Sequence, residues 1–338
     1  MKKIFLILAV FSALTTSVFA AKAKKSDKLK VVTTIFPVYD WTRGILGDNA
    51  KNDELTLLLG NGVDLHSYQP SIQDIAKIST ADIFIYVGGE SDGWVTDALK
   101  NATNKNMKVI NLMETLGDKV KAEEIKEGMQ AEEEDEHDHE HHEAEDEYDH
   151  HHHSSDEEEI EYDEHVWLSV RFAKILATEI ASALCEKDSV NSAAYKANLK
   201  AYTAKLDALD ADYAEAVKAG SKKTLLFGDR FPFRYLVDDY DLDYYAAFVG
   251  CSAETEASFE TIIFLANKVD ELTLNNVCQI ESGNGKIAKT IIQSSKNKNA
   301  KILTFDSLQS TTTKDIKKGS TYLSVMQKNL EVLKEALK

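Results

Sequence analysis

Short runs of β-branched and aromatic residues alternate with segments of helical periodicity in the first part of this 338-residue chain. The runs that predict strands are at 30–36, 54–59, 82–88 and 107–112. The helices expected between them span 39–46, 71–79 and 94–101. Strands that alternate with helices form parallel sheets through right-handed crossovers. The pattern therefore predicts an α/β lobe over residues 28–130.

The second half repeats this alternation after two long helical patterns within residues 165–220, at 166–187 and 191–218. The later of the two would be ~40 Å long at 1.5 Å per residue, which is long enough to join two lobes. In residues 221–338 the expected strands are 224–228, 242–248, 275–281 and 301–306, and the expected helices are 233–239, 258–269, 286–295 and 321–337. We expect an α/β fold of two lobes, each a mostly parallel sheet with flanking helices, joined by a long rigid helix. A ligand of such a fold binds between the lobes, beyond the carboxyl ends of the strands.

The first 20 residues carry two lysines, an apolar run and then small residues. This order predicts a cleavable secretory signal peptide ending at Ala20, with Ala21 as the alternative, and the apolar run is too short for a convincing membrane span. No later stretch approaches the ~20 apolar residues of a transmembrane helix. We expect a soluble periplasmic monomer.

The net charge of −18 comes from one segment. Residues 131–164 hold 19 of the 57 acidic residues and no lysine or arginine, which leaves 38 acids against 39 bases elsewhere. The rest of the chain is near neutral, and no basic patch indicates a nucleic-acid partner. The same segment holds eight of the ten histidines. It is too polar to fold alone, and its dense imidazoles and carboxylates predict a low-affinity collector of metal ions.

The other two histidines lie in separate local motifs, His66 in GVDLHSYQP and His165 in DEHVWLS. A lone loop histidine is more often exposed to solvent, and a histidine ahead of a helix often only caps it. Neutral imidazole is nevertheless a ligand for borderline divalent metals, as are carboxylates. A chain whose histidines are confined in this way is predicted to handle such a metal.

The three cysteines, Cys185, Cys251 and Cys278, have no CxxC spacing, and an odd number cannot form a complete disulfide framework. A bridge between Cys251 and Cys278 is one interpretation in an oxidising compartment. We favour the other, in which the thiols act as small apolar residues.

Several separated motifs occur in an order that resembles a known family. They are GVDLHSYQPS, DEHVWLS, FGDRFPFRYLVDDYDLDYYAAFVGCSAETEASFETI and IESGNGKIAKTI. Together they resemble the zinc and manganese ABC-transporter solute-binding proteins, cluster A-I, and within them the periplasmic high-affinity zinc-binding type with a His-rich loop. The resemblance covers nearly all of the chain after the signal peptide. It implies a receptor, not an enzyme, that captures Zn2+ between its lobes and delivers it to a membrane permease with a cytoplasmic ATPase.

The resemblance also implies four metal-binding positions. The first two match His66 and His165, and the fourth matches Asp306, although an aspartate after a strand is also a common turn residue. The third matches Gly228, which has no side chain to offer. The neighbouring Asp229 is our expected substitute.

Two alternatives bear on this third position. Glu281 is a second candidate ligand, at the end of the run NNVCQIE. Asp229 could instead pair with Arg230 or Arg234.

The choice of metal is not decided by this donor set. Two imidazoles with one or two carboxylates suit zinc, but the resemblance gives the same set to manganese receptors. The His-rich segment favours zinc, because dense imidazoles select zinc, copper or nickel over manganese. The alternatives are a manganese or iron receptor, a metalloenzyme with an open zinc position, and a metal-buffering protein or adhesin.

Overall fold

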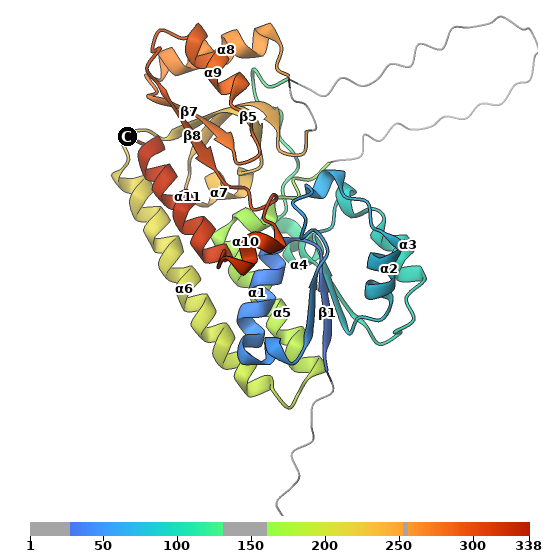
Figure 1. Ribbon diagram of the computed structural model, residues 1–338. Coiled ribbons are helices and arrows are strands. Elements are labelled where there is room, and N and C mark those ends of the chain that lie inside the picture. Colours follow the sequence, from blue (N-terminus) through green and yellow to red (C-terminus); the bar gives the residue numbers. More distant parts are fainter. Residues whose placement is uncertain (1–27, 131–160, 253–255) are drawn as a thin grey trace, which may run out of the picture.

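Two four-stranded parallel sheets form the framework of the protein in a computed structural model, which describes residues 28–130, 161–252 and 256–338 (Figure 1). The first sheet has the order β2-β1-β3-β4, with β1 (Lys30–Thr33), β2 (Glu54–Leu57), β3 (Ile83–Tyr86) and β4 (Lys108–Asn111). The second has the order β6-β5-β7-β8, with β5 (Thr224–Phe231), β6 (Asp243–Val249), β7 (Asn276–Ile280) and β8 (Lys301–Phe305). The predicted two-lobed α/β fold is confirmed.

Helices flank both sheets. Those of the first half are α1 (Phe36–Leu46), α2 (Ile72–Ser79), α3 (Val95–Lys100), α4 (Leu112–Leu116) and α5 (Val170–Lys187). Those of the second half are α7 (Arg234–Asp239), α8 (Phe259–Glu271), α9 (Lys286–Ser294), α10 (Thr313–Lys317) and α11 (Tyr322–Ala336). Between them α6 (Ser192–Ala219) has 28 residues and runs along one side of the molecule past both sheets, as the sequence predicts (Figure 1).

Local signals set several of these boundaries. Helix α2 begins directly after Ser71, whose hydroxyl accepts from the main-chain N–H of Asp74 while the Asp74 carboxylate accepts from the N–H of Ser71. This reciprocal capping box satisfies two N–H groups at the start of the helix. The sequence did not predict α4 and α10, because a helix of five residues is too short to show a periodicity.

Strand β5 is longer than its sequence pattern predicts. We expected a strand at 224–228 followed by a loop, but β5 continues to Phe231. After an irregularity between Phe227 and Arg230, pairing with β6 resumes, with Arg230 opposite Phe248 and Phe231 opposite Val249. The predicted end of this strand at 228 is therefore wrong, and Asp229 lies inside β5 and not in a loop after it.

One apolar core is shared by the two halves of the molecule. A continuous cluster of buried side chains extends from Leu29, next to β1, to Leu337, after α11. Helix α11 joins the halves: the Tyr322 ring meets Trp41 of α1 edge-on at 5.2 Å, and Tyr213 of α6 donates to the carbonyl of Met326 at 2.7 Å.

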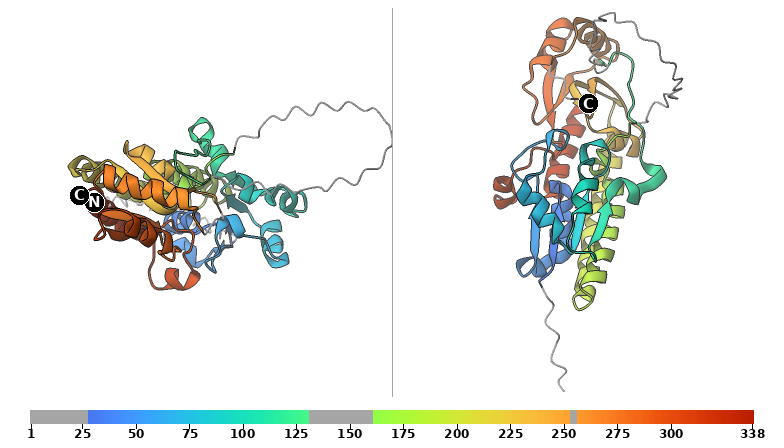
Figure 2. Two further views of the ribbon diagram at one scale, coloured as in Figure 1. Left: turned by 90° about the horizontal axis from the view of Figure 1, so that it is seen from above. Right: turned by 90° about the vertical axis from the view of Figure 1, so that its right-hand side faces the viewer.

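A second, smaller cluster lies between the second sheet and helices α8 and α9, at the end of the molecule opposite β1 (Figure 2). It includes Leu226 of β5, Leu265 of α8 and Ile291 of α9. No helix within the described ranges is both long and apolar enough to cross a membrane.

Two sequence predictions fall outside the described residues. These are the signal peptide at 1–20 and most of the acidic His-rich segment, whose part at 131–160 is not described. The prediction about the cysteines can be examined: all three are free thiols, so the bridge between Cys251 and Cys278 is not formed.

Candidate metal centre

His66 lies on a short 3-10 turn, Leu65–Ser67, in the loop that follows β2. The Asp64 carboxylate caps this turn by accepting from the main-chain N–H of His66 at 3.1 Å. Leu65 and Tyr68 on either side are buried in the main core, so the loop is anchored on both flanks. The His66 side chain keeps 12% of its surface exposed.

His165 immediately precedes a second 3-10 turn, Val166–Leu168, and its side chain is fully buried. One carboxylate oxygen of Asp163 accepts from the His165 main-chain N–H at 2.8 Å and lies 2.9 Å from its Nδ1. Trp167 fixes the turn from the other side, because its indole N–H donates to the carbonyl of Ser307 at 2.9 Å. His165 is therefore held in place through both its main-chain N–H and its ring.

The two predicted histidines meet although they are 99 residues apart in sequence: Nε2 of His66 lies 3.1 Å from Nε2 of His165. Two nitrogens bound to one tetrahedral zinc at 2.0–2.1 Å would be about 3.3 Å apart. The observed pair is therefore spaced for a single shared ion.

The opposite nitrogen of each ring already has a partner. Nδ1 of His165 contacts Asp163, and Nδ1 of His66 lies 2.8 Å from the Ser91 hydroxyl and 3.6 Å from a carboxylate oxygen of Glu164. A carboxylate or hydroxyl behind a metal-bound imidazole fixes its orientation and increases its basicity. This arrangement leaves the two Nε2 atoms to face an ion.

The electrostatic surroundings favour the uncharged form of His66. Its burial, together with the adjacent ring of His165, lowers the pKa of His66 to about 3. Burial acts in the opposite sense on the neighbouring acid, raising the pKa of Glu164. Because the neutral imidazole is the form that ligates metals, His66 is ready to bind an ion across the neutral pH range.

A third donor, Cys251, lies close to the two histidine rings. We did not predict it as a ligand. One ligand atom each of His66, His165 and Cys251 can be chosen so that all three lie within 4.8 Å of one another. Within the described parts of the chain, this is the one group of three or more His, Cys, Asp or Glu donors that is so compact. A sequence signal for it exists, since Cys251 follows directly on the run YYAAFVG at the carboxyl end of β6.

Asp229 does not belong to this donor group, because its carboxylate is used inside the second sheet. It accepts from the main-chain N–H of Arg230 at 2.9 Å and from that of Ile280 at 3.2 Å. The second bond ties β5 to the end of β7. Ligation by Asp229 stays a prediction that the observed geometry does not favour.

Asp306 likewise lies outside the group. Its carboxylate accepts from the main-chain N–H of Leu308 at 2.8 Å, which is the turn-forming role that an aspartate after a strand often has. Burial and the nearby Glu281 raise the pKa of Asp306 to about 6. Ligation by Asp306 also stays a prediction.

Glu281, the other candidate for the third position, is hydrogen-bonded to the loop after β8, which also contains Asp306. Its carboxylate accepts from the N–H of Ser307 at 2.7 Å and from the hydroxyl of Ser307 at 2.9 Å. It also accepts from the Ser310 hydroxyl at 2.5 Å. The loop after β8 therefore uses the Glu281 carboxylate to hold its own shape.

Gly228, which the resemblance aligned with the third ligand, packs against α9. A Cβ at this position would lie 2.6 Å from the Cα of Ala288 in α9, closer than real Cβ contacts. Residue 228 is therefore a glycine because α9 packs against β5 there. The third ligand has to come from another element.

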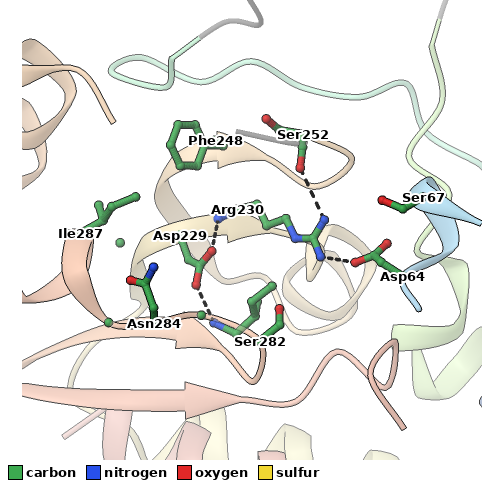
Figure 3. Close-up of a pocket in the computed structure, with 13 residues that line it drawn as sticks. Asp64, Ser67, Asp229, Arg230, Phe248, Ser252, Ser282, Asn284 and Ile287 are labelled. Atoms are coloured by element: carbon green, nitrogen blue, oxygen red, sulfur yellow. Dashed lines mark hydrogen bonds and ion pairs between the residues drawn. The ribbon is translucent and has the colours of Figure 1, made fainter. Parts of the chain in front are cut away.

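A cavity of 260 Å³ beside the loop that carries His66 is lined by both halves of the molecule (Figure 3). Asp64 and Ser67 line it from the loop after β2, and Arg230 extends into it from β5. The Arg230 guanidinium forms an ion pair with Asp64 and donates to the carbonyl of Ser252 at 3.4 Å. Arg230 thus links the loop that carries His66 to the turn that carries Cys251.

Comparisons with known proteins identify a family and relatives that the chain resembles. Residues 31–336 match the family model described as "Zinc-uptake complex component A periplasmic". The zinc-binding lipoprotein AdcA of Streptococcus pneumoniae serotype 4 is 33% identical over 99% of this chain, and the matched region is 61% of that protein's length. The high-affinity zinc uptake system protein ZnuA of Bacillus subtilis is 30% identical over 93% of this chain and 89% of its own.

Solved structures show the same fold. The Zn(II)-bound ZnuA-like domain of Streptococcus pneumoniae AdcA superposes with a TM-score of 0.66, at 28% identity, over 92% of this chain and 99% of that domain. The metal-dependent lipoprotein YcdH of Bacillus subtilis superposes with a TM-score of 0.69, at 27% identity, over 92% of this chain and 99% of its own.

Proposed function

Because the chain belongs to the ZnuA family of zinc-uptake components, we propose that it captures Zn2+ at the His66–His165 pair and passes the ion to an ABC importer. The observation that carries this proposal is the pair of facing Nε2 atoms, 3.1 Å apart, with both Nδ1 atoms engaged by other side chains. This is the arrangement of two imidazoles around one small divalent ion.

The proposed task is binding and release without catalysis. The zinc-binding and zinc-uptake names of the relatives support zinc as the ion. The family description supports an extracytoplasmic, periplasmic location, where the partner would be a membrane permease coupled to a cytoplasmic ATPase. The importer, not the receptor, would supply the energy for transport.

A zinc titration of the full-length chain against a competing chelator tests the proposal. Wild-type protein should bind one Zn2+ much more tightly than all others, and the double variant His66→Ala, His165→Ala should lose that tight site. A variant that lacks residues 131–160 serves as the matched control and should retain it. If the tight site disappears with the deletion and survives the double substitution, the protein is a buffer whose working part is the His-rich segment.

The same titration with Mn2+ examines the rival metal. The variant without residues 131–160 should bind Mn2+ far more weakly than Zn2+, because imidazole ligands favour zinc over manganese. Equal affinities for the two ions would replace the zinc receptor with a manganese receptor of the same fold.

A further inference from the structure

Cys251 lies in the turn that follows β6, close to the rings of His66 and His165. We infer that the Cys251 thiolate is the third protein ligand of the zinc site and that it makes the site selective for zinc over manganese. This inference rests on the proposed zinc-binding function. It assigns the missing third ligand to the second half of the chain, at a position other than Gly228, Asp229 or Glu281.

The distances allow this role. Nitrogen and sulfur ligands of one tetrahedral zinc lie about 3.6 Å apart, given bonds of roughly 2.0–2.1 Å and 2.3 Å. The chosen atoms of His66, His165 and Cys251 all lie within 4.8 Å of one another, so a side-chain adjustment of about an ångström closes the site. Zinc would draw the three donors together without any movement of the sheets.

The backbone around Cys251 is held in place. Its main-chain N–H donates to the Glu123 carboxylate at 3.2 Å. The preceding residue, Gly250, lies so close to the ring of His165 that an added Cβ would be 3.0 Å from its Cε1 and 2.9 Å from the carbonyl oxygen of Phe231. The turn therefore packs directly on the ring of His165.

The three donors also lie in a region of excess negative charge, which a bound cation would balance. The carboxyl groups of Glu123, Asp163 and Glu164 all interact electrostatically with Cys251. Within residues 28–130, 161–252 and 256–338, these three acids form no ion pair with lysine or arginine. Glu164 pairs with His66, and Asp163 pairs with His165. One carboxylate oxygen of the buried Glu164 has no hydrogen-bond partner there. A bound divalent cation would neutralise this group.

A thiolate changes which ions the site accepts. Soft sulfur ligands favour zinc, whereas manganese prefers carboxylate, carbonyl and water oxygens. As the Zn–S bond forms, the thiol proton passes to solvent. With Cys251 in place of Asp229 and Asp306, the donor set no longer suits the two metals alike.

Cobalt(II) titration of the full-length chain tests this assignment, because a thiolate bound to Co2+ gives a charge-transfer band in the near ultraviolet that imidazoles do not give. The wild-type band should saturate at one equivalent. Cys251→Ser should lose the band while keeping the weaker visible absorption of histidine-bound cobalt. Cys185→Ser, at another half-buried free cysteine, is the matched control and should keep the band.

Zinc affinity gives the second readout. Cys251→Ser should weaken Zn2+ binding by more than the roughly 10- to 100-fold that groups behind the ligands contribute, and should change Mn2+ binding much less. A wild-type protein that binds Co2+ tightly without the band, or a Cys251→Ser variant that keeps it, would overturn the assignment and leave the zinc receptor intact. Absence of any tight site for Co2+ or Zn2+ in the wild type would overturn the proposed function itself.

Discussion

The two sheets have equivalent strand orders, but the residues at their carboxyl ends are used differently. After β2, the His66 ring takes part in a compact donor group, and after β3 the Ser91 hydroxyl contacts the far nitrogen of that ring. In and after the strands of the second sheet, Asp229, Glu281 and Asp306 are occupied by N–H groups of their own strands and loops. A donor at the end of a strand can serve as a ligand only where the surrounding backbone leaves it free.

The largest expected effect is that of removing the buried histidine. His165→Ala should weaken Zn2+ binding by well over ~100-fold, since a direct ligand is worth more than the groups behind it. Because the His165 ring is fully buried, the substitution should also lower the melting temperature of the protein in the presence of a chelator. His66→Ala, at a side chain with 12% exposure, should lose zinc with a smaller change in melting temperature. Equal losses of stability in the two variants would contradict this difference in burial.

Asp163→Asn should give the next largest change in zinc binding. Asparagine keeps the shape and an oxygen that can accept from the main-chain N–H of His165, but it removes the negative charge behind the ring. Such positioning groups contribute roughly 10- to 100-fold in metal affinity. Competition titration measures the loss, and the visible spectrum of the cobalt form should still show both histidines bound. A variant with wild-type affinity would mean that the negative charge of Asp163 behind His165 does not contribute to zinc binding.

Gly228→Ala examines the second sheet at the position that faces α9. The added methyl group would collide with the backbone of Ala288, and overpacking of this kind costs about 1–3 kcal/mol. Urea unfolding should show this loss, while the folded variant should keep its zinc affinity. Weaker zinc binding at unchanged stability would place residue 228 next to the metal.

The smallest effects are expected for the carboxylates of the second sheet. Asp306→Asn keeps an oxygen that can accept the observed bond from the main-chain N–H of Leu308. Asp229→Asn keeps an acceptor for only one of its two main-chain bonds, because Arg230 and Ile280 donate to different carboxylate oxygens, and this variant should lose some stability. Each should change zinc affinity by less than about threefold, or ~0.7 kcal/mol. A 100-fold loss of zinc affinity in either variant would mean that its aspartate is a zinc ligand. The two sheets would then not differ in how they use these side chains.

The sequence predicted the framework well, because buried parallel strands and amphipathic helices leave periodic apolar patterns. Each of the eight predicted strands is present, although β5 and β6 run past their predicted ends, and the spine α6 has the predicted length of 28 residues. The continuation of β5 to Phe231 was not predictable in this way, since an irregularity in the pairing interrupts its pattern at Asp229.

The metal centre was predictable only in part. His66 and His165 stand in motifs with buried neighbours, and the fold brings them together. Cys251 was missed because a cysteine after an apolar run is ordinarily a small packing residue, and only the tertiary fold brings its turn against His165. The roles of Asp229 and Asp306 depend on which N–H groups lie within reach, a tertiary property that residue type does not encode.

The continuous core has a consequence for how the molecule comes apart. Since Trp41 near the start of the chain packs against Tyr322 near its end, neither half can open without exposing the apolar surface of the other. The two halves should therefore melt in one cooperative transition. The separate cluster around Leu265 and Ile291 is the exception, and the amides of α8 and α9 should exchange with solvent through a local opening at lower free energy than those of α1 and α11.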